Sequence, residues 1–184
     1  MIAPALSLLT LLALHAAGGA AAPASTAIML PEGLPDGHYE GDGSIDPATG
    51  FSRYTYVGPI DYEAVANYTA AIAAASTTST DALVRRATVN CNGRSAGDST
   101  GSVQNAFASN WDGKDFSGKW AKTTQGSSQA YACNYGGKQT IHKNDYLSNM
   151  GSVNSVCGSS NSGWFEHPEW KLNYGRDNIN AGIC

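Results

Sequence analysis

The stretch KWAKTTQGSSQAYACNY, residues 119–135, decides the fold of this 184-residue chain. It contains two strand-like runs, Lys119–Thr124 and Gln129–Tyr135, which are joined by Gln125-Gly126-Ser-Ser, a composition typical of a tight turn. Gly136-Gly137 then breaks the strand pattern. The stretch therefore predicts a β-hairpin.

Two amphipathic segments flank this hairpin. Residues 100–111 and residues 143–156 each place apolar side chains at helical spacing. The second segment stops at Cys157-Gly158, where glycine can take the left-handed conformation that commonly ends a helix. Each segment is therefore predicted to be a helix with one face turned to the core.

Two further strands complete the pattern. Ala87–Cys91 alternates before the first helix, and Gly163–Leu172, interrupted at Pro168, follows the second, before residues 179–184 close the chain. The order β-α-β-β-α-β predicts an α+β fold of the split sandwich type, in which two helices cover one face of an antiparallel sheet.

All four cysteines lie in this part of the chain, at positions 91, 133, 157 and 184. An even number without a Cys-x-x-Cys pair or a His cluster predicts two disulfides, with no metal site and no cofactor. Four cysteines allow three pairings, and the residues alone do not choose among them. In the predicted sheet the first strand neighbours the third and the fourth, so the pairing Cys91–Cys133 with Cys157–Cys184 is slightly favoured. A bridge that closes such a loop of about 40 residues contributes about 4 kcal/mol.

The N-terminal part of the chain has the composition of a leader. Residues 1–24 combine an apolar run with a small-residue cleavage zone and are predicted to be a signal peptide, with a membrane anchor as the alternative. Residues 25–86 are rich in turn formers and acidic, with a strand-like run at 52–57 and a helix-like run at 61–75. They hold the chain's one N-glycosylation sequon, at Asn67.

The leader ends in the dibasic pair Arg85-Arg86, which predicts a processing site that releases residues 87–184 as the mature, disulfide-stapled domain. The alternative is an uncut protein in which both arginines are ordinary surface residues. The whole chain has a net charge of −4, whereas residues 87–184 hold eight Lys and Arg against seven Asp and Glu. A nearly neutral domain excludes the strong electrostatic footprint of a nucleic-acid-binding or membrane-surface protein.

Residues 87–184 resemble small secreted fungal effector proteins and killer-toxin-like proteins. The resemblance is carried by the first cysteine on an opening strand, by Tyr131–Gly137, by Cys157-Gly158, and by the terminal Tyr174-Gly-Arg and Gly182-Ile-Cys184. It implies an α/β sandwich without catalytic residues that acts on a host or a competitor organism. Virulence, necrosis induction and channel inhibition all occur among such proteins, and nothing in this chain selects one of them.

One group of side chains has the composition of a hydrolytic site. A small secreted ribonuclease needs a His, a carboxylate and an Arg, and His142, Glu166 and Arg176 supply those types. No local motif joins them, and Glu166 and the adjacent His167 would point to opposite faces of a strand. The alternative is that all three are ordinary loop and strand residues.

Aromatic side chains suggest a second kind of site. Tyr135, Trp170, Tyr174 and Arg176 are the candidates for a partner-binding surface, and a hydrophobic core is the alternative for the aromatic members. We therefore expect a secreted, monomeric effector or toxin-like protein that acts without catalysis on a host or competitor protein or glycan. The alternatives are a small secreted ribonuclease and a cell-wall carbohydrate-binding protein.

Overall fold

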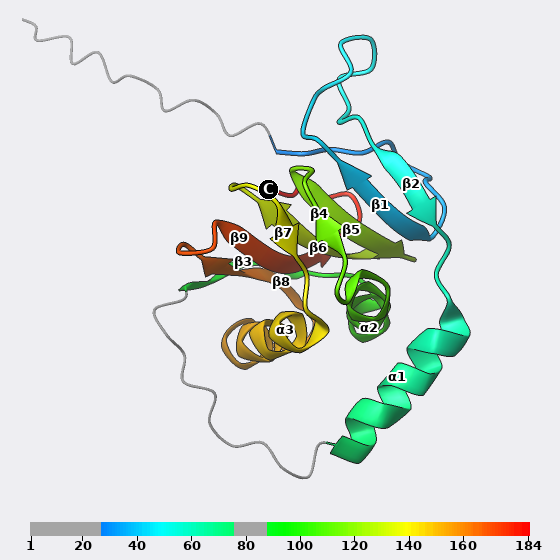
Figure 1. The fold of residues 1–184 in the computed structure, drawn as a ribbon, viewed down its shortest axis with the longest axis vertical. Helices are drawn as coiled ribbons and strands as arrows, with labels where there is room; N and C mark the ends of the chain where they lie inside the picture. The colour runs from blue at the N-terminus through cyan, green and yellow to red at the C-terminus, as the bar shows by residue number, and fades with distance from the viewer. Residues whose placement is uncertain (1–26, 76–87) are drawn as a thin grey trace, which may run out of the picture.

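The computed structural model describes residues 27–75 and 88–184, which form an antiparallel seven-stranded sheet, a two-stranded sheet and three helices (Figure 1). The predicted signal peptide and the dibasic pair lie outside the described residues. In chain order the elements are β1 (Gly37–Gly41), β2 (Thr55–Gly58), α1 (Tyr62–Ala75), β3 (Thr88–Ser95), α2 (Thr100–Trp111), β4 (Asp115–Phe116), β5 (Trp120–Gln125), β6 (Ser128–Asn134), β7 (Gln139–Thr140), α3 (Lys143–Cys157), β8 (Asn161–His167) and β9 (Leu172–Asn178).

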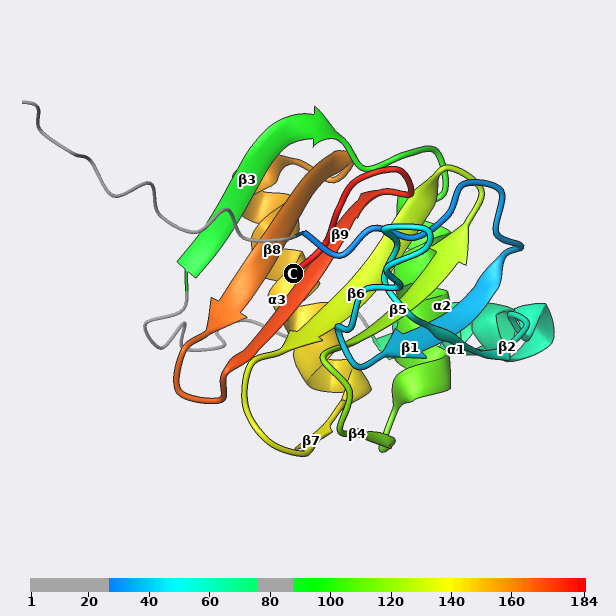
Figure 2. The ribbon, with the colours of Figure 1, turned by 90° about the horizontal axis from the view of Figure 1, so that it is seen from above.

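The predicted hairpin is confirmed and lies in the middle of the large sheet. β5 and β6 pair antiparallel from Trp120 opposite Cys133 to Gln125 opposite Ser128, and Gly126 in the turn has a φ of 55°. The strand order is β2-β1-β5-β6-β9-β8-β3 (Figure 2), and β4 pairs with β7 apart from it. The predicted α+β class with an antiparallel sheet is therefore confirmed.

Helices α2 and α3 cover one face of this sheet (Figures 1 and 2). Along β6, Ala130 and Ala132 belong to the core beneath the helices, whereas Tyr131 and Cys133 belong to a second core on the opposite face. Side chains alternate between the two faces of a strand, so a strand with both faces covered is buried at every residue. This is the pattern of β6, all seven residues of which are buried.

The segment predicted as one broken strand, Gly163–Leu172, is instead two strands. β8 and β9 form a hairpin that turns through Pro168 to Lys171. Proline removes one backbone donor, and Lys171 takes a φ of 53°, which a continuing strand does not tolerate.

The additional strand changes the neighbours in the sheet and with them the disulfides. β3 pairs with β8 and lies at the edge, three strands away from β6. At about 4.8 Å per strand this separates Cys91 from Cys133 by about 14 Å, twice the Cα–Cα distance a disulfide can span. The favoured pairing was therefore wrong, and the bridges are Cys91–Cys157 and Cys133–Cys184, with Cα–Cα distances of 5.6 and 5.4 Å.

The two bridges lie on opposite faces of the sheet. Cys91 on β3 is joined to Cys157, the last residue of α3, so the predicted end of this helix at Cys157-Gly158 is confirmed. Gly158 has a φ of 89° and a ψ of 150°, a glycine conformation other than the predicted left-handed helical one. Cys133 on β6 instead ties down the C-terminal residue over the helix-free face. One disulfide thus links α3 to the sheet, and the other links the C-terminal residue to the opposite face of the sheet.

Residues 27–75 are part of the same sheet. β1 pairs with β5 over five residues, and β2 extends the sheet beyond β1. The predicted helix over 61–75 is confirmed as α1, whereas the strand β2 begins three residues later than the predicted run and extends to Gly58. α1 packs on α2, with Val65 and Ile60 against Ala106.

Candidate functional site

A hollow of about 280 Å³ lies on the helix-free face of the sheet, around the Cys133–Cys184 bridge. Strands β3, β6, β8 and β9 and the C-terminal residues form its walls. Two aromatic side chains give it contact area, Tyr135, which is 49% exposed, and Trp164. The other residues that line it are Ala27, Asn92, Arg94, Tyr131, Cys133, Asn173, Asp177, Gly182, Ile183 and Cys184.

Hydrogen bonds fix the two aromatic rings at the hollow. The indole Nε1 of Trp164 donates to Oε1 of Glu166 at 2.9 Å, and the Tyr135 hydroxyl donates to the Cys184 carbonyl at 3.4 Å. Burial, followed by the nearby Glu166 carboxylate, raises the pKa of Tyr135. The phenol is therefore a neutral donor at physiological pH.

A buried carboxylate organises the polar end of the hollow. Asp177 is 3% exposed and accepts hydrogen bonds from Asn92 Nδ2 at 2.9 Å and from Ser162 Oγ at 2.6 Å. Arg94 Nε lies 3.6 Å from the same carboxylate, and its side chain is 59% exposed. Asp177 thus orients the guanidinium of Arg94, and the exposed part of the Arg94 side chain is accessible to a ligand.

This combination of groups suits recognition of a ligand by contact. Flat aromatic faces pack against sugar rings or apolar side chains, while amide, guanidinium and hydroxyl groups at the rim give direction to hydrogen bonds. Of the candidates for a partner-binding surface, Tyr135 is the one that lines the hollow.

A second unusual position on the helix-free face is Lys122 of β5. Its side chain is 3% exposed, and Nζ donates to Oε1 of Gln129 at 2.8 Å. No carboxylate of the described residues lies within 4.0 Å of this nitrogen. Burial without a counter-charge lowers the pKa of Lys122 to about 7.

The amine of Lys122 borders a cavity of about 180 Å³. Residues 30–34 form one wall, and Thr124, Gly126, Ile179 and Asn180 complete the lining. A segment from the N-terminal part of the chain therefore covers the one side of this lysine that the sheet leaves open.

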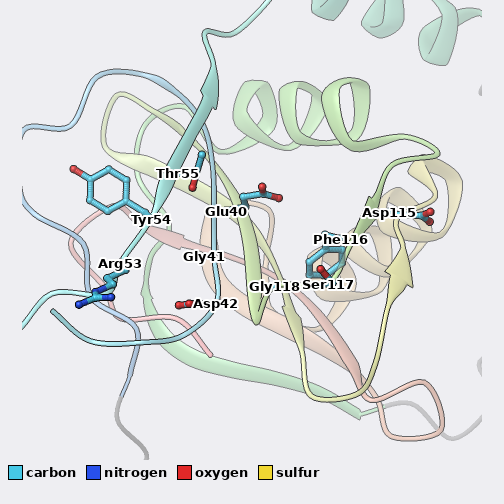
Figure 3. Close-up of a pocket in the computed structure, with 10 residues that line it drawn as sticks. All are labelled: Glu40, Gly41, Asp42, Arg53, Tyr54, Thr55, Asp115, Phe116, Ser117 and Gly118. Atoms are coloured by element: carbon cyan, nitrogen blue, oxygen red, sulfur yellow. The ribbon is translucent and has the colours of Figure 1, made fainter.

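Another hollow, of about 400 Å³, lies between the β1–β2 turn region and the loop before β5 (Figure 3). Three carboxylates stand around it, those of Glu40, Asp42 and Asp115, but Asp115 is already bound by Lys138 and Thr140. Arg53 and Asp115 lie at opposite ends of the hollow in Figure 3. Among residues 27–75 and 88–184, no three His, Cys, Asp or Glu side chains gather in a way that would hold a metal ion.

The three residues of the nuclease alternative do not meet. His142 is exposed at the start of α3, whereas Arg176 is buried beside the end of that helix. Arg176 binds the Asn154 side chain and the Gly158 carbonyl, and Asn154 lies twelve residues, or about 18 Å, along the helix from His142. Glu166 is on the opposite face of the sheet, bound to Trp164. No single substrate phosphate can contact all three.

The remaining candidates for a binding surface divide in the same way. Tyr174 and Arg176 are each 1% exposed, so their assignment to a surface was wrong. Tyr174 packs edge-on against Tyr146 of α3, and Arg176 donates to the carbonyls of Gly158 and Asn161, which follow the end of that helix. Trp170 is 47% exposed and stacks on His167 with ring centroids 4.2 Å apart, outside the hollow.

The sequence did not single out Lys122, Asn92 or Asp177. Lys122 lies between Ala121 and Thr123 inside a strand, and this local sequence gives no sign that residues 30–34 cover its side chain. Asn92 is followed by Gly93, a typical turn pair, and Asp177 is adjacent to Arg176, a typical local ion pair. In each case the partner comes from a different element.

Comparison of the chain with protein-family models, with curated proteins and with solved structures finds no match. None of the helices that the structure describes is long and apolar enough to cross a membrane. Asn67 is exposed on α1, so its side chain is open to modification.

Proposed function

We propose that this chain is an exported effector or toxin-like protein, matured by cleavage after Arg86, which binds a host or competitor molecule without catalysing a reaction. The observation that carries the proposal is the hollow around Cys133–Cys184, where Tyr135 and Trp164 are presented beside an oriented, exposed Arg94. The Cys133–Cys184 disulfide lies in this hollow, and Cys91–Cys157 links α3 to the sheet on the other face; two such bridges suit a protein that works outside the cell.

The decisive experiment separates binding at this hollow from general surface effects. Purified protein is applied to candidate target cells, and growth inhibition or cell death is measured for the wild type and for Trp164→Ala and Arg94→Ala. We expect both variants to lose at least tenfold in potency, because each removes a contact group without removing a core residue. Trp170→Ala is the matched control, since its indole is exposed but lies outside the hollow. Equal potency of all four proteins would exclude the hollow as the site of action.

A cell-wall carbohydrate is the second candidate ligand. It is favoured by the combination of aromatic faces with the side-chain amides of Asn92 and Asn173 in one hollow. Retention on chitin or glucan that Trp164→Ala abolishes, with no effect on living cells, would support this alternative over the first.

A further inference from the structure

We infer that residues 27–75 remain docked on residues 88–184 after cleavage at Arg85-Arg86, so that the mature protein consists of two chains held together without a disulfide. The inference rests on the processing step in the proposed function. It changes the expected product, because the segment upstream of the cut becomes a permanent subunit.

The first support is a continuous strand pairing. β1 pairs with β5 along its full length, from Gly37 opposite Thr124 to Gly41 opposite Trp120. A second link lies at the far end of the chain, where Ile28 and Ile183 exchange both backbone hydrogen bonds, at 2.8 and 3.1 Å. Removal of the segment would leave the inner edge of β5 unpaired, which is unfavourable in a folded sheet.

The second support is a shared hydrophobic core. On the helix-free face, Ile28 and Tyr39 from the segment pack with Trp120, Tyr131 and Ile183 from the domain. Tyr39 is 1% exposed and Trp120 is fully buried. These rings would face water if the segment left, and the hydrophobic effect therefore opposes its release.

The third support is a polar contact that spans the junction on the helix side. Nδ1 of His38 lies 2.7 Å from the hydroxyl of Thr123, with both side chains buried. Asp36 also accepts a hydrogen bond from the backbone N–H of Gly126 at 2.9 Å. If the two parts separated, His38 and Thr123 would lose this contact and would hydrogen-bond to water instead.

Two glycines of residues 88–184, Gly118 and Gly182, lie in close contact with residues 27–75. A Cβ at Gly118 would lie 2.6 Å from the carbonyl oxygen of Gly41, and one at Gly182 would lie 2.6 Å from Cβ of Ala27. Such distances leave no room for a side chain, so both positions need glycine only because the segment is present.

No covalent link crosses between the two parts except the peptide chain. All four cysteines lie in residues 88–184, and they pair with one another. The association is thus predicted to resist reducing agents but to fail in denaturant. This distinguishes it from a disulfide-linked two-chain protein.

The test uses the whole exported chain, cut in place. Arg85-Arg86 is the sequence's one pair of adjacent basic residues, so an endoprotease specific for paired basic residues cuts there; a variant with a site-specific protease sequence inserted after Arg86 provides a second route. Gel filtration and native mass spectrometry then report whether the fragments are associated. We expect one 1:1 species at pH 7.5 that separates on denaturing gels without reductant. Separate elution of the two fragments under native conditions would overturn the inference.

A matched pair of variants tests whether the described contacts hold the fragments together. Gly118→Val pushes a side chain into the Gly41 carbonyl, whereas Gly137→Val adds the same atoms where nothing lies within 4 Å. We expect at least a tenfold larger fraction of free fragment for Gly118→Val than for Gly137→Val after cleavage. Tyr39→Ala removes a ring from the segment side and should likewise increase the fraction of free fragment. It replaces Gly118→Val in the comparison if the uncut Gly118→Val chain does not fold. Equal retention in all three variants would contradict the inference.

The outcomes keep this inference separate from the proposed function. If residues 87–184 elute separately after cleavage and still inhibit target cells, docking is refuted and the effector proposal stands. A stable two-chain protein that is inert on cells and does not bind glucan or chitin would support docking and contradict the effector proposal.

Discussion

Replacing Lys122 with methionine removes a buried cation while keeping the length of the side chain. In the folded protein burial lowers the pKa of this amine from 10.5 to about 7. The unfolded chain keeps the proton up to its ordinary value, so between pH 7 and 10.5 the unfolded state binds one more proton than the folded state. The free energy of unfolding of the wild type therefore rises with pH in this window, and below pH 7 the full cost is present.

The expected magnitude follows from the shift. A difference of about 3.5 pKa units corresponds to about 5 kcal/mol, with a slope of at most about 1.4 kcal/mol per pH unit. Methionine avoids this cost but leaves Oε1 of Gln129 without its donor, a pH-independent loss of about 1–3 kcal/mol. At pH 6 Lys122→Met should thus be about 2–4 kcal/mol more stable than the wild type.

Urea unfolding of both proteins at pH 6, 7.5 and 9 measures the effect. The advantage of Lys122→Met should shrink by about 2–3 kcal/mol between pH 7 and pH 9, because the wild-type amine is neutral at the higher value. The control is Lys119→Met, a neighbouring lysine whose side chain is exposed. A difference between Lys122→Met and the wild type that does not change with pH would refute the reasoning, since it would mean that Lys122 keeps its ordinary pKa in the fold.

Three further perturbations test the same physical picture. Burial, followed by the positive charge of Lys114, lowers the pKa of His38 to about 4, so wild-type stability should fall by about 3 kcal/mol as pH drops from 6.5 to 4; acid titration of His38→Gln should lack this loss, and parallel curves would contradict it. Arg176→Lys keeps the charge but cannot reproduce all the bonds to Asn154 in α3 and to the carbonyls of Gly158 and Asn161, and should lower the free energy of unfolding by about 2–3 kcal/mol in urea, whereas a neutral result would show that these bonds contribute nothing. Replacing both Cys133 and Cys184 with serine opens a loop with a sequence separation of 51 and should cost about 4 kcal/mol in the same assay; a cost under 1 kcal/mol would mean that other contacts already fix the C-terminus.

The sequence predicted those elements whose evidence is local. The β5–β6 hairpin, α2 and α3 each follow from periodicity and turn residues within one short segment. The fate of residues 163–178 was harder, because a hairpin and a broken strand have the same composition around Pro168. That one missed turn added a strand, moved β3 away from β6, and made the favoured disulfide pairing wrong.

The site was less predictable, because it depends on contacts between distant segments. Tyr174 and Arg176 have side chains that commonly bind partners at a surface, yet α3 covers both of them. Lysine is a residue type that is usually exposed on a strand, yet residues 30–34 cover Lys122. In each case the covering element is separated from the strand by many residues, and periodicity within a strand carries no information about such a cover.

The junction of β1 and β5 combines these points. His38 faces Thr123 on the helix side, while Tyr39 lies directly opposite Lys122 in the register on the other side. Burial lowers the pKa of both His38 and Lys122, so protonation of either side chain destabilises the folded junction. Acid therefore weakens the junction on both faces of the sheet. A two-chain product held by this junction should therefore dissociate more readily at pH 4 than at pH 7.5, whereas a cut protein whose association is held elsewhere would not. Dissociation that is independent of pH between these values would show that β1 and β5 are not the contact that keeps the fragments together.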